Sequence, residues 1–124
     1  MYFELLSAVL YRVITVADGI EVIKKLREIR PDLILLDVMM PRLNGISACR
    51  EIRGAIGPHV PIIFLSAVNE VETVRRALEV GGDDYVVKSG NMDAVLTRVK
   101  FWTQPISLEA RQKRRKAALA SLAT

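Results

Sequence analysis

Short apolar runs alternate along this chain with longer segments in which apolar positions recur every three or four residues. Four of the short runs are typical of strands: YRVITVA at 11–17, DLILLD at 32–37, PIIFLSA at 61–67 and DYVVK at 84–88. Runs that are apolar at nearly every position are typical of strands buried on both faces, as in a parallel sheet.

The segments after these runs have helical periodicity. Apolar residues at spacings of three and four predict helices at 19–30, 45–57, 69–82 and 91–102. Strand and helix therefore alternate, which predicts βαβ units with right-handed crossovers around a parallel sheet. The expected fold class is α/β.

Length and composition add few constraints. The 124 residues predict one main domain, and 51% of them are hydrophobic, which is enough for a sizeable core. No apolar run approaches the roughly 20 residues of a membrane span, and the first residues lack the features of a signal peptide, so we expect a cytoplasmic protein with no membrane partner. The single cysteine, Cys49, excludes an internal disulfide and lies on a predicted apolar helix face, where it is expected to fill the core.

Polar residues stand at the carboxyl ends of three predicted strands. Asp37, Ser66 and Lys88 each follow their own apolar run. In open parallel sheets, chemistry collects at this edge. A carboxylate there can form an acyl phosphate, and a hydroxyl and an ammonium can bind phosphoryl oxygens, so the three residues suggest phosphoryl chemistry.

Three segments resemble a known family: LILLDVMMPRLNG at 33–45, PIIFLSA at 61–67 and GGDDYVVK at 81–88. They look like parts of a response-regulator receiver domain of two-component signalling. The specific feature is an aspartate followed by Met-Pro and then Gly after an apolar strand. The resemblance covers residues 11 to about 102 and implies a flavodoxin-like, three-layer α/β/α fold, with an additional helix at the C-terminal end.

The resemblance also implies roles for individual residues. Asp37 would be the phosphoacceptor, Ser66 and Lys88 would contact the phosphoryl group, and Tyr85 would be the switch residue. Mg²⁺ would be held by Asp37 and the backbone of Met39. The implied partners are a sensor histidine kinase or phosphotransfer protein and an output domain or protein, which would be contacted through residues 69–102.

The sequence departs from the family in its acidic residues. The family has two adjacent carboxylates at the end of its first strand, which hold Mg²⁺, whereas the acids before Asp37 in this chain are all isolated: Glu4, Asp18, Glu21, Glu28 and Asp32. Mg²⁺ prefers octahedral oxygen coordination, which one aspartate supplies poorly. We therefore expect phosphorylation of Asp37 to be strongly impaired or absent. Ser89 replaces the family's usual proline after the lysine, so the loop that carries Lys88 is expected to be looser.

The first strand of the family is also missing. One expectation, slightly favoured, is a four-stranded sheet in which 11–17 pairs beside 32–37. The alternative is that MYFELL at 1–6 enters as a substitute strand, from its own chain or from a neighbouring copy. Either arrangement removes a helix that would cover one sheet face, so a homodimer or a domain swap is a reasonable hypothesis.

The C-terminal segment 105–124 is treated as a tail on a receiver-like domain of residues 1–104. Its residues favour helix, Ser107 is a candidate cap, and RQKRRK at 111–116 supplies five basic groups. Without them the chain has 13 basic against 14 acidic residues, so its net charge of +4 belongs to this tail. The interpretations, in order, are a solvated linker helix, a helix packed in place of the lost first helix, and a nucleic-acid or membrane contact, with nucleic acid judged an unlikely partner.

The leading interpretation is a receiver module that regulates a partner by protein contact and is not an enzyme. The alternatives are a pseudo-receiver or a truncated or engineered receiver fragment without phosphotransfer, and a small flavodoxin-fold phosphotransfer enzyme. The enzyme would require a second acid and a pocket, which the sequence does not reveal. The pair Asp83 and Asp84 is interpreted as a turn into the strand at 84–88, and His59 is given no role.

Overall fold

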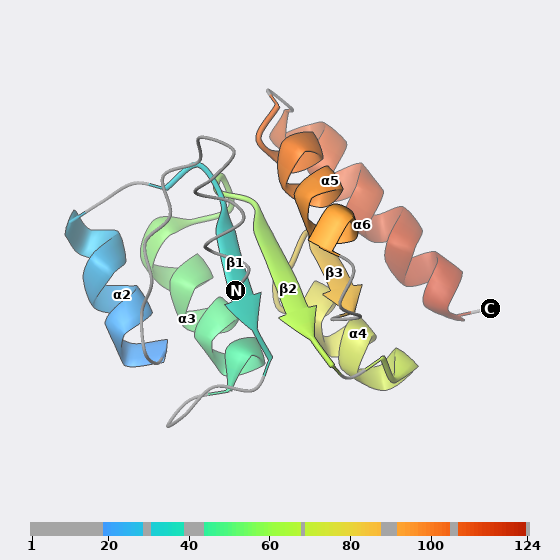
Figure 1. Cartoon of the computed structure of the whole chain (residues 1–124), viewed down its shortest axis with the longest axis horizontal. Helices are drawn as coiled ribbons and strands as arrows, with labels where there is room; N and C mark the ends of the chain where they lie inside the picture. Colours follow the sequence, from blue (N-terminus) through green and yellow to red (C-terminus); the bar gives the residue numbers. More distant parts are fainter. Residues whose placement is uncertain are drawn as a thin grey trace.

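The computed structural model describes residues 19–28, 31–38, 44–67, 69–87, 92–104 and 107–123. Its elements, in chain order, are α2 (Gly19–Glu28), β1 (Ile34–Asp37), α3 (Gly45–Ile56), β2 (Ile62–Ser66), α4 (Val71–Glu79), β3 (Asp84–Val87), α5 (Met92–Trp102) and α6 (Leu108–Ala123). The described strands form a parallel sheet in the order β1-β2-β3 (Figure 1). The predicted α/β class, parallel sheet and additional C-terminal helix are confirmed.

The observed strands and helices are shorter than the sequence segments in which they were predicted. The strand expected at 61–67 is observed as Ile62–Ser66, and the helix expected at 69–82 as Val71–Glu79. The predicted strand at 11–17 and the substitute strand at 1–6 lie outside the described residues. Neither arrangement of a further strand is therefore tested.

Helices cover both faces of the sheet and divide the core into two clusters. On one face α2, α3 and α4 pack over the sheet, and the fully buried side chains there include Cys49, Ile52 and Phe64. On the other face α5 packs against the sheet through Val95, Val99 and Trp102. Side chains alternate between the faces of a strand, so successive residues of β2 enter opposite clusters. This explains why all five residues of β2 are buried.

Local sequence determines where α3 ends. Gly57 follows its last residue and adopts φ 78°, a left-handed conformation that residues with a Cβ rarely adopt. Its N–H donates to the carbonyl oxygen of Arg53 at 2.9 Å. The helix therefore ends at Ile56, one residue before the end of the predicted range, and the chain turns toward β2.

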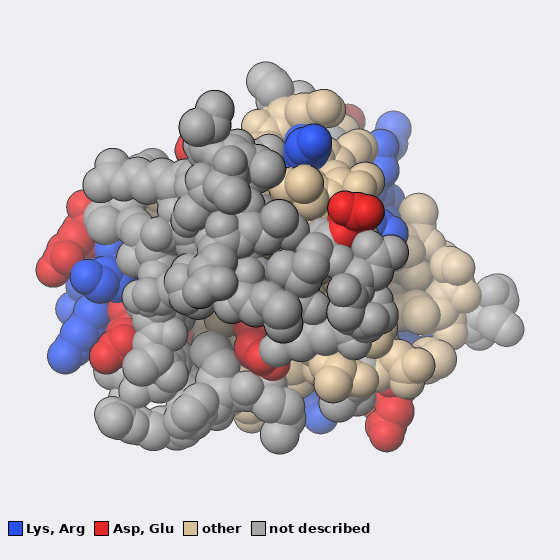
Figure 2. Space-filling view, in the orientation of Figure 1, with Lys and Arg blue, Asp and Glu red and all other residues tan. Residues whose placement is uncertain are grey.

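The outer surface of α2 is charged with mixed sign. Its exposed side chains include both acidic and basic residues, namely Glu21, Lys24, Lys25, Arg27 and Glu28, and Figure 2 shows both colours together over this helix. Such a surface is typical of a solvated helix face. Among the described residues, every helix is too short or too polar to cross a membrane.

Cys49 fills the core as predicted. Its side chain is buried, and its sulfur lies 3.7 Å from the carbonyl oxygen of Val80. Burial raises the pKa of the thiol to about 11, although the nearby guanidinium of Arg53 opposes the shift. Less of the thiolate, which is the reactive form, is therefore present at neutral pH.

We expect the native Cys49 thiol to react with a thiol-specific disulfide reagent at pH 8 at least about 100-fold more slowly than the urea-unfolded chain, because reaction requires local opening. Absorbance of the released chromophore measures the rate, and free cysteine in each buffer is the control. Rapid stoichiometric labelling of the folded protein would contradict this prediction.

Candidate functional site

The carboxyl edge of the sheet carries two of the predicted site residues. Asp37 is the last residue of β1 and Ser66 is the last residue of β2. The register pairs Asp37 with Leu65, so Ser66 is the next residue along the neighbouring strand. Asp37 is half-buried and Ser66 is buried. The structure therefore brings these two residues to one edge of the sheet, as the sequence predicts.

The third predicted residue follows β3. The register pairs Ser66 with Val87, the last residue of β3, so the chain continues from Val87 at the same edge. Lys88 itself lies outside the described residues, as does Met39, the proposed backbone ligand of the metal. Their roles remain predictions.

Gly45 holds the chain close to Asp37 after the loop that follows β1. Its N–H donates to the carbonyl oxygen of Val38 at 2.7 Å. A Cβ at Gly45 would lie 2.0 Å from the carbonyl oxygen of Asp37, far inside contact distance. Asn44, the preceding residue, caps α3 by accepting a hydrogen bond from the N–H of Ser47 at 2.8 Å. A glycine is therefore required where the start of α3 touches the backbone of the candidate phosphoacceptor.

Tyr85 lies on β3, on the sheet face covered by α3 and α4. It is half-buried, and its ring stacks against Phe64 with centroids 6.3 Å apart. These contacts show that Tyr85 packs against the core of this face. The proposed switch role is not tested by these contacts.

The described residues at this edge supply an incomplete set of ligands for Mg²⁺. Among the described residues, no group of three acidic, histidine or cysteine side chains is placed to share a metal ion. The carboxylate of Asp37 and the hydroxyl of Ser66 would fill only part of an octahedral shell, so phosphate, water and residues outside the described ranges would have to supply the rest.

A second cluster of charged groups lies at the opposite, amino-terminal edge of the sheet. Asp83 directly precedes β3, and its carboxylate is fully buried. Its Oδ2 accepts a hydrogen bond from the N–H of Ile62, the first residue of β2, at 2.9 Å. The same oxygen is 2.9 Å from a guanidinium nitrogen of Arg53. Burial lowers the pKa of the Arg53 guanidinium, and the Asp83 charge opposes this shift.

Two further arginines reach the same carboxylate from α6. Arg111 donates through Nη2 to Oδ2 at 2.9 Å and through Nε to Oδ1 at 3.2 Å, a bidentate arrangement. Arg115 donates to Oδ1 at 3.0 Å. Arg111 is only 3% exposed. The expectation of a solvated linker helix was therefore wrong, because this face of α6 is anchored to the core by charge.

Asp84, the other member of the acidic pair, makes separate contacts. Its Oδ2 accepts hydrogen bonds from Trp102 Nε1 and from Arg98, each at 2.9 Å, both on α5. Adjacent residues in an extended segment point to opposite sides. The interpretation as a turn into the strand described the backbone but missed the partners of both carboxylates.

A signal for the second cluster was present in the sequence. The residues of α6 that are at least half-buried include a stripe at alternating spacings of three and four: Leu108, Arg111, Arg115, Ala118 and Leu122. That spacing is typical of the buried face of a helix. A search for apolar residues misses this stripe because two of its members are arginines. It is found only if arginine is also counted as a residue that can be buried.

Comparison with known sequences identifies relatives over most of the chain. The family model of the response regulator receiver domain matches residues 2–100. The DNA-binding response regulator MtrA of Mycobacterium tuberculosis is 41% identical over 85 residues, which cover 68% of this chain and 36% of that protein. The probable transcriptional regulator ycf27 of Guillardia theta is 40% identical over 95 residues, which cover 77% of this chain and 37% of that protein. The chain thus spans a little over a third of the length of these curated relatives.

Solved structures give the same result. The receiver domain of a sensor histidine kinase from Pseudomonas aeruginosa, which has a magnesium ion coordinated in its active-site cleft, is 34% identical with a TM-score of 0.73, covering 83% of this chain and 85% of that one. The receiver domain of NtrX from Brucella abortus, 20% identical with a TM-score of 0.77, covers 85% of this chain and 88% of that one and shares the fold. The chain therefore belongs to the response regulator receiver domain family of two-component signalling and has its flavodoxin-like fold.

Proposed function

We propose that this chain is a signalling module in which Asp37 is a weak phosphoacceptor and that it regulates a partner by protein contact. The observation that carries the proposal is the placement of Asp37 and Ser66 one residue apart in register, at the carboxyl edge of the sheet. In this assignment Ser66 hydrogen-bonds one phosphoryl oxygen, and Lys88 offsets the charge of another. Tyr85 is the residue that would respond to phosphorylation.

Weak phosphotransfer is proposed because of the donor set. A transferring phosphoryl group carries charge on its equatorial oxygens, and a bound metal normally neutralises much of it. The acids that precede Asp37 in this 124-residue chain are isolated from one another. Asp37 and the backbone of Met39 would therefore hold Mg²⁺ poorly, and Lys88 would supply most of the stabilising charge.

The proposed partners follow from the family. A sensor histidine kinase or a phosphotransfer protein would donate the phosphoryl group to Asp37. An output domain or protein would contact the surface formed by residues 69–102, which includes α4, β3 and α5. The chain would act through these contacts and not as an enzyme. The division into a receiver-like body of 1–104 and a tail of 105–124 remains part of the proposal, as does a dimer or domain swap.

Incubation with acetyl phosphate and Mg²⁺ tests the phosphoacceptor. We expect slow and partial modification on a phosphate-sensitive gel, and none in Asp37→Asn, because the carboxylate is the nucleophile but lacks a complete metal site. A receiver domain with the full acidic pair serves as the positive control.

The other outcomes of this test separate the alternatives. Rapid, stoichiometric modification that depends on Asp37 would refute the impairment. Modification that persists in Asp37→Asn would refute the assignment of the nucleophile. If the intact chain stays unmodified and NMR signals near Asp37 do not respond to Mg²⁺, the pseudo-receiver interpretation replaces this one.

A further inference from the structure

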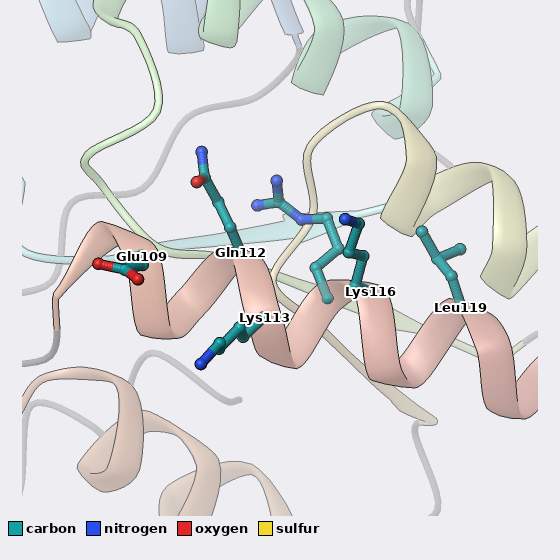
Figure 3. Close-up of a pocket in the computed structure, with 6 residues that line it drawn as sticks. Glu109, Gln112, Lys113, Lys116 and Leu119 are labelled. Carbon is teal, nitrogen blue, oxygen red and sulfur yellow. The ribbon is translucent and has the colours of Figure 1, made fainter.

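The inward face of α6 contacts the rest of the protein mainly through charged side chains. Arg111 and Arg115, one helical turn apart, point into the body, whereas Lys113, Arg114 and Lys116 are exposed. A hollow of about 430 Å³ along the helix is lined by α6 alone, and Figure 3 shows Lys113 directed away from the side that carries Gln112 and Lys116. The basic run is therefore divided between an inward pair, of which Arg111 is buried and Arg115 is half-buried, and a set of exposed residues.

This inward pair binds a set of hydrogen-bond acceptors at the amino-terminal edge of the sheet. Asp83 supplies its charge, and backbone carbonyl oxygens complete it. Arg115 donates to the carbonyl oxygens of Gly82 at 2.9 Å and Gly81 at 3.0 Å, and Arg111 donates to that of His59. A guanidinium presents several donors in a fixed plane, which matches such a set of acceptors better than an ammonium does.

Arg53 shows that the acceptor site does not depend on α6 alone. This α3 residue holds Asp83 at 2.9 Å and the Gly81 carbonyl oxygen at 2.7 Å. Asp83 is further fixed by the N–H of Ile62. The carboxylate of Asp83 would thus keep its contacts with Arg53 and Ile62 if α6 moved away. We therefore expect the acceptor groups to stay in place without the helix.

The docked helix lies on the surface formed by residues 69–102. Near its C-terminal end, the carbonyl oxygen of Leu122 accepts a hydrogen bond from Arg75 of α4 at 3.3 Å. In its middle, the guanidinium of Arg114 lies 4.5 Å from the ring centroid of Phe101 on α5. Figure 1 shows α6 beyond β3, the last strand of the described sheet. The helix therefore contacts both helices of the proposed output surface.

We propose that this surface is a receptor for a helix that carries two arginines four residues apart, and that α6 is its occupant in the same chain. A partner that uses residues 69–102 must then displace α6, and Arg53 would keep Asp83 paired while the helix is away. The inference rests on the proposed function only for the role of this surface, because docking of α6 does not involve phosphorylation of Asp37.

Hydrogen exchange of the full chain tests the docking. In the double variant Arg111→Gln/Arg115→Gln, we expect amides of 108–122 to exchange at least about tenfold faster than in the unmodified chain, because the helix loses its anchors. The matched control, Lys113→Gln/Lys116→Gln, removes the same charge from the exposed face and should exchange as the unmodified chain does. Equal protection in all three proteins would overturn the proposal.

A labelled peptide with the sequence of residues 105–124 tests the receptor, with fluorescence anisotropy as the readout. A helix tethered in the same chain competes at an effective concentration of about millimolar, so micromolar peptide should bind neither the unmodified chain nor the lysine control. It should bind the arginine double variant, whose site is vacant. Adding Asp83→Asn to that variant should abolish binding.

Each other result contradicts the proposal. Equal binding to all proteins would mean non-specific attraction by a basic peptide. Absence of binding to an arginine variant whose α6 exchanges rapidly would mean that the surface is no receptor for this helix. Because neither experiment includes a phosphoryl donor, their failure is distinguishable from failure of the phosphoacceptor assignment.

Discussion

Replacement of Asp83 by alanine is expected to lower the free energy of unfolding by about 3–5 kcal/mol. The substitution leaves the guanidinium groups of Arg53, Arg111 and Arg115 without their carboxylate, and Arg111 is almost fully buried. Removing one member of a buried ion pair is strongly destabilising because the remaining charge has lost both water and its partner. Urea unfolding followed by far-ultraviolet circular dichroism measures the change.

The neighbouring residue provides a matched control. Asp84 also binds an arginine, but the side chain of Arg98 is 54% exposed, so water can replace that contact, and the remaining loss is the acceptor of the uncharged Trp102 indole N–H. We expect Asp84→Ala to lower the free energy of unfolding by about 1–2 kcal/mol, less than Asp83→Ala, because no buried charge loses its partner. Similar losses for the two alanine variants would show that the buried ion pairs of Asp83 stabilise the fold no more than the contacts of Asp84 do. If Asp83→Ala does not fold, Asp83→Asn, which keeps the shape of the side chain, should give a smaller measurable loss.

Replacement of Gly45 by alanine is expected to lower the free energy of unfolding by about 3 kcal/mol. The new Cβ would lie 2.0 Å from the carbonyl oxygen of Asp37 and 2.8 Å from the Cα of Val38. Both are backbone atoms, which cannot rotate away as a side chain can, so the start of α3 and the end of β1 must separate. Chemical denaturation measures the loss, and NMR chemical shifts of Asp37 should report displacement at the candidate site.

Gly54 is the control for this substitution because it lies on the same helix with nothing within 4 Å of its missing Cβ. There alanine should raise the free energy of unfolding by about 0.5–1 kcal/mol, through its higher helix propensity. An unchanged stability in Gly45→Ala would mean that the backbone at Asp37 yields easily. It would then argue against a rigidly held phosphoacceptor.

Much of the fold and part of the candidate site could be predicted from the sequence alone. Continuous apolar runs indicated strands buried on both faces, and β2 is buried along its whole length. The ends of those runs placed Asp37 and Ser66 at one edge, because parallel strands expose their carboxyl ends together. These features are local: each depends on the order of apolar and polar residues within a few positions.

The docking of α6 was decided only by the tertiary structure. Arg111 and Asp83 are 28 residues apart, and hydrophobic periodicity assigns both to solvent. A charged side chain is buried in the core only when a particular partner neutralises its charge and satisfies its hydrogen bonds. The sequence thus determined the sheet and the position of its candidate phosphoacceptor. The tertiary structure decided which charges are buried, because burial of a charge depends on partners that the fold brings together.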